Sequence, residues 1–291
     1  MLSIVICSKD KNQFINVSKN IEETIGIDYE IIKIDNINND FGICKAYNAG
    51  ASLSKYQLLC FVHEDILVHT QNWGKVIINF FNKNQEAGIL GVAGSKYKSI
   101  VPSIWAQGLY NTDSLNIIQH YADTVANINS TVKFDEVKTL DGVFLCCTKE
   151  IWSKNKFDEI NFDKFHFYDL DFCTQVGQYN KIYATGEILI EHFSSGNLNR
   201  DWVEYSVKYT RKWLHILPLG NLSRNQQKLI EWRNRKILFF RMNILNYPLI
   251  DILKIFFSWK FISNSSLYDV IGFVVKLFLT RIKIIKSDKF Y

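Results

Sequence analysis

The stretch LLCFVHEDILV, residues 58–68, is an apolar run that is interrupted once, by His63, Glu64 and Asp65. A short buried-looking run followed by clustered acids is typical of a strand in a parallel sheet whose carboxyl end presents charged side chains. Open α/β sheets bind their ligands at that edge. We therefore expect this strand to deliver acids that hold a divalent metal ion.

The residues on either side of this stretch alternate between strand and helix patterns. Strands are predicted at residues 3–7, 29–34, 56–62 and 89–93, and helices at residues 12–25, 43–54 and 72–84. This alternation predicts a parallel, right-handed, doubly wound α/β sheet. The first strand would end at Ser8 and Lys9 and the second at Asp35, at the same edge as His63.

Residues 94–138 have the weakest pattern in the chain and predict a long loop with a β excursion. Their aromatic and imidazole side chains are Tyr97, Trp105, Tyr110, His120 and Tyr121. These rings fit either of two interpretations. They could present platforms to a sugar or a base, or they could be ordinary surface packing, and the pattern leaves both open.

A second acidic cluster lies in FHFYDLDF, residues 165–172, after a strand pattern at 139–147 and a short helix at 149–154. Asp169 and Asp171 fall in the first turn of a predicted helix, where carboxylates are stabilised and can cap backbone donors. Capping alone would explain them. The functional interpretation comes from their combination with strands at 181–185 and 188–192, the second of which ends at His192. Asp65 and His192 would offer one oxygen and one nitrogen ligand to Mn²⁺ or Mg²⁺.

The charge of the chain is divided unevenly. The 291 residues have a net charge of +5, but residues 216–291 hold 13 Lys and Arg against 4 Asp and Glu, a net charge of +9. Residues 1–215 therefore carry a net charge of −4. This shift predicts a catalytic body at 1–215 and a basic helical extension at 216–291.

The first residues and the cysteines indicate the cellular compartment in which we expect the protein. Met1 leads directly into LSIVIC without the features of a secretory signal, so we expect a cytoplasmic protein. The 6 cysteines lack CxxC pairs and zinc spacing and lie mostly in apolar runs, which favours reduced core thiols. An apolar content of 47% is enough for a substantial core.

The basic extension predicts helices. Residues 223–226, SRNQ, resemble a capping box, and Pro248 suits the first turn of a second helix. In the last segment a polar stripe is predicted from Asp269, Gly272, Lys276, Thr280, Lys283 and Ser287. No apolar run approaches the roughly 18 to 20 residues that span a bilayer. These helices either pack on the body or bind an anionic membrane surface at the inner face of the cell membrane, and the concentrated cations favour the membrane. Nucleic acid is excluded as a partner because the segment is too apolar.

The order of several motifs resembles a known family. SIVIC, EIIKIDN, GICKAYNAGASLSKYQLLCFVHED, LDGVFLCCTKEIW, FHFYDLDFC and EHFSSGN follow one another as in family 2 type glycosyltransferases, in their bacterial polysaccharide-associated branch. The resemblance covers residues 1 to about 215. It implies a GT-A fold, a doubly wound mixed sheet with helices on both faces, here followed by a C-terminal helical extension.

The resemblance also implies a role for each matching residue. Asp65, with His63 and His192, would hold Mn²⁺ or Mg²⁺ against the diphosphate of a nucleotide sugar, with a UDP-sugar as the expected donor. Asp169 would be the general base, with Asp171 as its alternative. The nucleotide sugar would contact Ser8, Lys9, Asp35, Lys45, Asn48, Glu64, Asp141 and Gly142.

Two positions depart from the family pattern. His63 stands where the family has the first Asp of its metal motif, and Tyr168 where it has the Glu of a Glu-Asp pair. The expected function is an inverting, non-processive transfer of a sugar to a glycan or lipid-linked saccharide in cell-surface polysaccharide synthesis. The alternative that these departures support is a catalytically silent GT-A domain that binds a nucleotide sugar or scaffolds a membrane-surface assembly.

Overall fold

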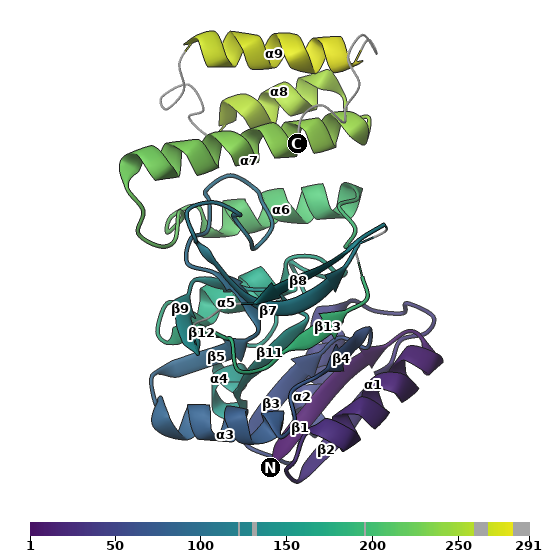
Figure 1. The fold of residues 1–291 in the computed structure, drawn as a ribbon. Coiled ribbons are helices and arrows are strands. Elements are labelled where there is room, and N and C mark those ends of the chain that lie inside the picture. The colour runs from purple at the N-terminus through teal and green to yellow at the C-terminus, as the bar shows by residue number, and fades with distance from the viewer. Residues whose placement is uncertain (122, 130–132, 195, 259–266, 282–291) are drawn as a thin grey trace. The chain divides into compact units, whose positions relative to one another are not determined.

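A computed structural model describes residues 1–121, 123–129, 133–194, 196–258 and 267–281. The chain forms two compact units (Figure 1). The first contains residues 1–98 and 105–196, and the second contains residues 99–104 and those from 197 onward. The division predicted at residue 215 from charge therefore differs from the division by packing, because helix α6 (Arg200–Trp213) groups with the helices that follow it.

The first unit is built on a seven-stranded sheet in the order β2-β1-β3-β11-β5-β12-β9. Its strands are β1 (Leu2–Ser8), β2 (Tyr29–Asp35), β3 (Leu58–Val62), β5 (Ala87–Gly91), β9 (Phe134–Val137), β11 (Phe144–Thr148) and β12 (Lys181–Thr185). Strand β1 is parallel to β2 and β3, and β12 is parallel to β5.

The mixed sheet of the GT-A fold is confirmed, and the all-parallel sheet predicted from the strand–helix alternation is wrong. Strand β11 runs antiparallel to both β3 and β5, and β9 runs antiparallel to β12. A parallel neighbour needs a crossover of about a dozen residues or more. Strand β11 is instead entered from β10 of a second sheet, and its neighbours β3 and β5 come from distant parts of the chain, so no crossover helix joins it to either of them directly.

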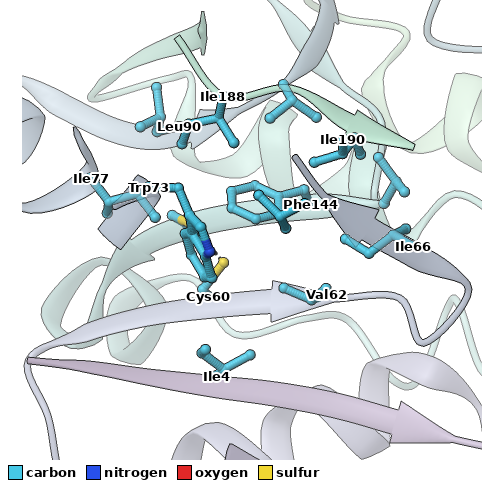
Figure 2. Packing of buried hydrophobic residues seen from close by; sticks show 14 of the residues in the cluster. Ile4, Cys60, Val62, Ile66, Trp73, Ile77, Leu90, Phe144, Ile188 and Ile190 are labelled. Atoms are coloured by element: carbon cyan, nitrogen blue, oxygen red, sulfur yellow. Dashed lines mark hydrogen bonds between the residues drawn. The ribbon is translucent and has the colours of Figure 1, made fainter. Parts of the chain in front are cut away.

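The helices of this unit are α1 (Lys11–Thr24), α2 (Ile43–Leu53), α3 (Trp73–Lys83), α4 (Lys149–Lys154) and α5 (Tyr168–Val176). Helix α1 begins where the Asp10 carboxylate accepts hydrogen bonds from the backbone N–H groups of Asn12 and Gln13. Figure 2 shows the core between the sheet and α3, where Trp73 and Ile77 pack toward Cys60 and Phe144. The six cysteines are not paired in disulfides and five of them are buried, as expected for thiols in the core.

A second sheet in the first unit has the order β10-β6-β7-β13-β4, with β8 paired to β7. Its strands are β4 (Ile66–Val68), β6 (Ala93–Ser95), β7 (Asp113–His120), β8 (Val125–Asn129), β10 (Thr139–Leu140) and β13 (Ile190–His192). The region predicted as a loop at 94–138 thus contains more strand than expected. Tyr97 is fully buried and Trp105 packs on the core, as the packing interpretation predicts for these rings. Tyr110 and Tyr121 are exposed.

The second unit is helical and consists of α6, α7 (Arg224–Ile244), α8 (Leu249–Ser258) and α9 (Leu267–Arg281). The predicted capping box at the start of α7 is confirmed: the backbone N–H of Gln226 donates to Ser223 Oγ, and the backbone N–H of Ser223 donates to Gln226 Oε1. Helix α6 was not predicted. The buried Glu231 of α7 also holds residues 99–101, because it accepts hydrogen bonds from Ser99 Oγ and from the backbone N–H groups of Ile100 and Val101.

Helix α9 packs against α7 through Phe273, whose ring contacts those of Phe239 and Phe240. Its exposed residues include Gly272 and Lys276 of the predicted polar stripe. They also include four apolar residues: Ile271, Val274, Val275 and Phe278. The stripe is therefore only part of the exposed surface, and Lys283 and Ser287 lie outside the described residues. Among the described helices, none is long and apolar enough to span a bilayer.

Candidate active site and metal centre

Three side chains from two distant segments meet at the carboxyl end of β3. His63 and Asp65 lie between β3 and β4, and His192 ends β13. His63 Nδ1 lies 3.8 Å from Asp65 Oδ1, and His192 Nε2 lies 3.6 Å from the same oxygen. Each residue offers one ligand atom, and these atoms lie within 4.8 Å of one another, the one such group in the described part of the chain. The three predicted metal ligands are therefore brought together.

The hydrogen bonds of His192 show that the cluster fits a cation. Its Nδ1 lies 3.1 Å from Gln119 Oε1. The Gln119 amide nitrogen donates to the carbonyl oxygens of His120 and Ser194, which fixes its oxygen toward His192. Nδ1 therefore carries the proton in the neutral imidazole. The buried Nε2 has no hydrogen-bond partner and directs a lone pair at the Asp65 carboxylate. Two facing electron-pair donors leave a position for a positive ion between them.

Burial and neighbouring charges shift the pKa values of all three residues of the cluster. Burial opposes ionisation of Asp65, but the adjacent imidazoles of His192 and His63 outweigh it, so the pKa of Asp65 is lowered. Burial likewise opposes a charge on His192, yet Asp65 and Asp141 raise its pKa. For His63 burial dominates and the pKa is lowered, which favours the neutral imidazole that can act as a ligand.

Asp169 lies beside this cluster in the first turn of α5. The residue before the helix, Phe167, has left-handed backbone torsions with φ 66°, which turns the chain sharply before Tyr168 and Asp169. The Asp169 carboxylate accepts hydrogen bonds from the backbone N–H groups of Gly142, at 3.0 Å, and Leu170, at 2.8 Å. Removal from water and the nearby Asp141 outweigh these bonds and raise the pKa of Asp169 to about 7. Such a carboxylate can accept a proton near neutral pH.

Tyr168 joins the two parts of the site. Its hydroxyl lies 2.6 Å from His63 Nε2. Gly142 makes room for this hydroxyl, because a Cβ at that position would lie 1.9 Å from Tyr168 Oη. The same glycine donates its N–H to Asp169. Metal cluster and carboxylate are therefore connected by one tyrosine and one glycine.

Four other predicted residues lie at the carboxyl ends of β1, β2 and β3. Glu64 Oε1 accepts hydrogen bonds from the backbone N–H groups of Lys9 and Asp10, so it ties the end of β3 to the end of β1. Ser8 is buried and its hydroxyl has no partner in the described structure. Asp35 pairs with Ser8 across β1 and β2 and is exposed, with its carboxylate bonded to Lys33 and to the backbone of Ile37. Their contacts with a nucleotide stay predictions.

Lys45, Asn48 and Asp171 lie in helices and differ in how exposed they are and in how many hydrogen bonds they make to other residues of the chain. The Lys45 side chain is exposed and lines a cavity of about 210 Å³ with Phe41 and Glu159. The Asn48 amide donates to Phe157 O and Glu159 and accepts from Trp152 and from the backbone of Phe157. Asp171 is buried and accepts a hydrogen bond from Gln175. Asn48 and Asp171 thus have structural roles that the sequence did not predict.

Gln119 contacts the candidate site but was not predicted from the sequence. It lies in β7 opposite His192 of β13, within the segment whose pattern predicted only a loop with a β excursion. A glutamine in such a segment gives no signal. Only the register of the two strands makes it the partner of the histidine.

Comparisons with known proteins agree with this architecture. A family model described as "Glycosyltransferase like family" matches residues 3–211. The chain therefore belongs to this glycosyltransferase-like family. A search of curated proteins finds no match.

Solved structures show the GT-A glycosyltransferase fold. GalNAc-T7 in complex with UDP, GalNAc and Mn²⁺ is similar with a TM-score of 0.53 and 11% identity, over 94% of this chain and 57% of that one. TarS from S. aureus is similar with a TM-score of 0.51 and 11% identity, over 98% of this chain and 53% of that one. The chain thus spans little more than half of each. A TarS fragment of residues 1–349 has a TM-score of 0.50 and 12% identity, over 96% of this chain and 80% of the fragment.

Proposed function

We propose that this protein is a metal-dependent inverting glycosyltransferase that moves a sugar from a nucleotide diphosphate sugar to an acceptor hydroxyl. The observation that carries the proposal is the cluster of His63, Asp65 and His192 next to a carboxylate, Asp169, whose pKa is raised to about 7. The GT-A fold of the chain and a structure of similar fold that contains UDP, GalNAc and Mn²⁺ support a UDP-sugar donor. The acceptor proposed is a glycan or lipid-linked saccharide in cell-surface polysaccharide synthesis, and the transfer is proposed to be non-processive.

Each group of residues in the site has a separate proposed role. Asp65, His192 and His63 would hold Mn²⁺ or Mg²⁺, which when bound neutralises the charge that develops on the departing diphosphate. Asp169 takes the proton from the acceptor hydroxyl as that oxygen forms a bond to the anomeric carbon and the bond to the diphosphate oxygen breaks. The N–H groups of Gly142 and Leu170 orient the Asp169 carboxylate for this step. Asp35, Lys9 and Ser8 would line the nucleotide side, at the ends of β1 and β2.

A second candidate is a catalytically silent GT-A domain that binds nucleotide sugar or scaffolds a membrane-surface assembly. The observation in its favour is that Tyr168, at the position where the resemblance led us to expect a Glu, offers no carboxylate and is hydrogen-bonded to His63.

Incubation with a panel of nucleotide sugars and saccharide acceptors separates the two candidates. We expect metal-stimulated release of nucleoside diphosphate with at least one donor, because a carboxylate that accepts protons near neutral pH lies next to the metal ligands. The measurement is a coupled assay for the diphosphate, with and without Mn²⁺. Nucleotide binding by calorimetry without turnover on any donor would support the silent domain instead.

We also propose that the helical unit binds an anionic membrane surface. Helix α9 exposes Ile271, Val274, Val275 and Phe278, and residues 216–291 carry a net charge of +9. An apolar helix face in a cationic segment suits the interface of an anionic bilayer. Together with the expected cytoplasmic location, this would place the enzyme at the inner face of the cell membrane, near lipid-linked acceptors.

Vesicle flotation tests the membrane proposal. The full-length protein should float with vesicles containing anionic phosphatidylglycerol and should float less with neutral phosphatidylcholine. Val275→Asp together with Phe278→Asp should reduce flotation, because each adds an acidic group to the apolar face. Glu150→Gln, an exposed change on α4, is the control. If the wild type and both variants were all recovered in the unbound fraction, the proposal would be wrong.

A further inference from the structure

His63 and Tyr168, the two residues that differ from the glycosyltransferase pattern that the sequence resembles, are in contact with each other. His63 and Tyr168 are 105 residues apart, and His63 Nε2 lies 2.6 Å from Tyr168 Oη. A tyrosine hydroxyl can either donate or accept a hydrogen bond. The bond therefore bears on which nitrogen of His63 holds the proton.

The tyrosine is rigidly held. Its ring packs against Tyr47, with centroids 5.7 Å apart, and against Phe157, with centroids 6.2 Å apart. The hydroxyl occupies the space that Gly142 leaves open. Tyr168 is therefore placed by packing and can orient His63 rather than follow it.

The opposite edge of the His63 ring faces the candidate metal position. His63 Nδ1 lies 3.8 Å from Asp65 Oδ1. If Nε2–H donates to Tyr168, Nδ1 is left with a lone pair that faces the same position as His192 Nε2. Both imidazoles would then have the same arrangement, with the outer N–H bonded to a protein oxygen and the inner nitrogen free. Metal-binding histidines are commonly oriented by such an outer acceptor.

We propose that Tyr168 is a positioning residue that makes His63 a metal ligand, and that the resulting set of two imidazoles and one carboxylate selects a transition-metal ion over Mg²⁺. Imidazole suits transition metals, whereas Mg²⁺ prefers oxygen ligands and retains its water. A set in which His63 and His192 supply two of the three ligands therefore favours ions that accept nitrogen ligands, Co²⁺ strongly and Mn²⁺ less strongly, over Mg²⁺. This inference rests on the proposed metal-dependent function, and its use in catalysis follows only if that function holds.

Metal titration without any nucleotide or sugar tests the inference apart from the enzyme activity. Co²⁺ and Mn²⁺ are added to full-length wild type, to Tyr168→Phe and to Tyr179→Phe, and binding is followed by visible absorption for Co²⁺ and by paramagnetic resonance for Mn²⁺. Tyr168→Phe should weaken both affinities by about 10- to 100-fold, the usual effect of removing an outer partner of a ligand. Tyr179→Phe, whose side chain is 83% exposed, should bind as wild type.

A change in metal preference is the second readout. Wild type should retain Mn²⁺ in an excess of Mg²⁺. The double variant His63→Asp, Tyr168→Glu, which restores two carboxylates, should release Mn²⁺ at lower Mg²⁺ concentration. Melting curves check that each variant is folded.

Spectra of the wild-type protein provide a test that needs no variant. The ¹⁵N chemical shifts of the imidazoles should show His63 protonated at Nε2 and His192 at Nδ1 in the metal-free protein. A proton on Nδ1 of His63, or wild-type affinity in Tyr168→Phe, would overturn the inference. If Tyr168→Phe binds metal like wild type and still transfers sugar, the inference about Tyr168 is wrong and the proposed function stands. If wild type binds metal specifically but transfers no sugar, the proposed function is wrong and the inference about metal binding stands.

Discussion

Asp169→Asn should lower the rate of sugar transfer by about 10²- to 10⁴-fold, which is the usual contribution of a general base. Asparagine has a similar shape but cannot accept the proton of the acceptor hydroxyl. Donor affinity should change little, because the metal ligands His63, Asp65 and His192 remain in place. The measurement is kcat for transfer together with donor affinity by calorimetry. Near-normal transfer by Asp169→Asn would contradict the assignment of the base.

Asp171→Asn is the matched control for this change. Asp171 lies in the same helix turn, but it is buried and bonded to Gln175, so its change should leave more activity than the change at Asp169. If instead Asp171→Asn abolished transfer while the protein stayed folded, Asp171 would be the better candidate.

The pH dependence follows from the same carboxylate. The base acts when deprotonated, so kcat/KM in wild type should rise as pH passes through about 7, the raised pKa of Asp169. A folded-state pKa of about 7 lies above the ordinary 3.8, so the folded protein holds this proton more tightly than the unfolded one. Asp169 therefore reduces stability as pH rises between these values. Asp169→Asn should therefore not lower Tm above neutral pH. If Asp169 only stabilised the fold, the same substitution would lower Tm.

Asp65→Asn should lower both metal affinity and transfer, each by about 100-fold or more, because it removes the one carboxylate of the cluster. The oxygen of Asp65 faces both His63 Nδ1 and His192 Nε2, so no other side chain in the cluster supplies its charge. The measurements are Mn²⁺ titration of the free protein and transfer at several Mn²⁺ concentrations.

Glu150→Gln makes the same chemical change at an exposed position paired with Lys154 and should leave both quantities unchanged. Added Mn²⁺ should restore part of the transfer in Asp65→Asn if weak binding is the defect. Full activity of Asp65→Asn in the presence of a chelator would show that the cluster is not needed for the chemistry.

Much of the fold could be predicted from local sequence. The strand pattern of residues 58–62 and the acids after it place His63 and Asp65 at a carboxyl edge, and the capping residues at Asp10 and Ser223 mark two helix starts. These features depend on neighbours a few residues away, where periodicity and capping rules apply. The direction of β11 could not be predicted in this way, because it depends on which distant strands lie on either side of it.

The sequence by itself determined which side chains are available for the site: two histidines and a carboxylate that can bind a metal, and an aspartate at a helix start. The tertiary structure alone decided what they do. Strand register pairs Gln119 with His192, and packing places Tyr168 on His63 and Asp141 near Asp169. Tautomers and raised pKa values depend on hydrogen-bond partners and charges within a few ångströms. In this chain those partners come from segments about 30 to 100 residues away, which no local pattern can identify.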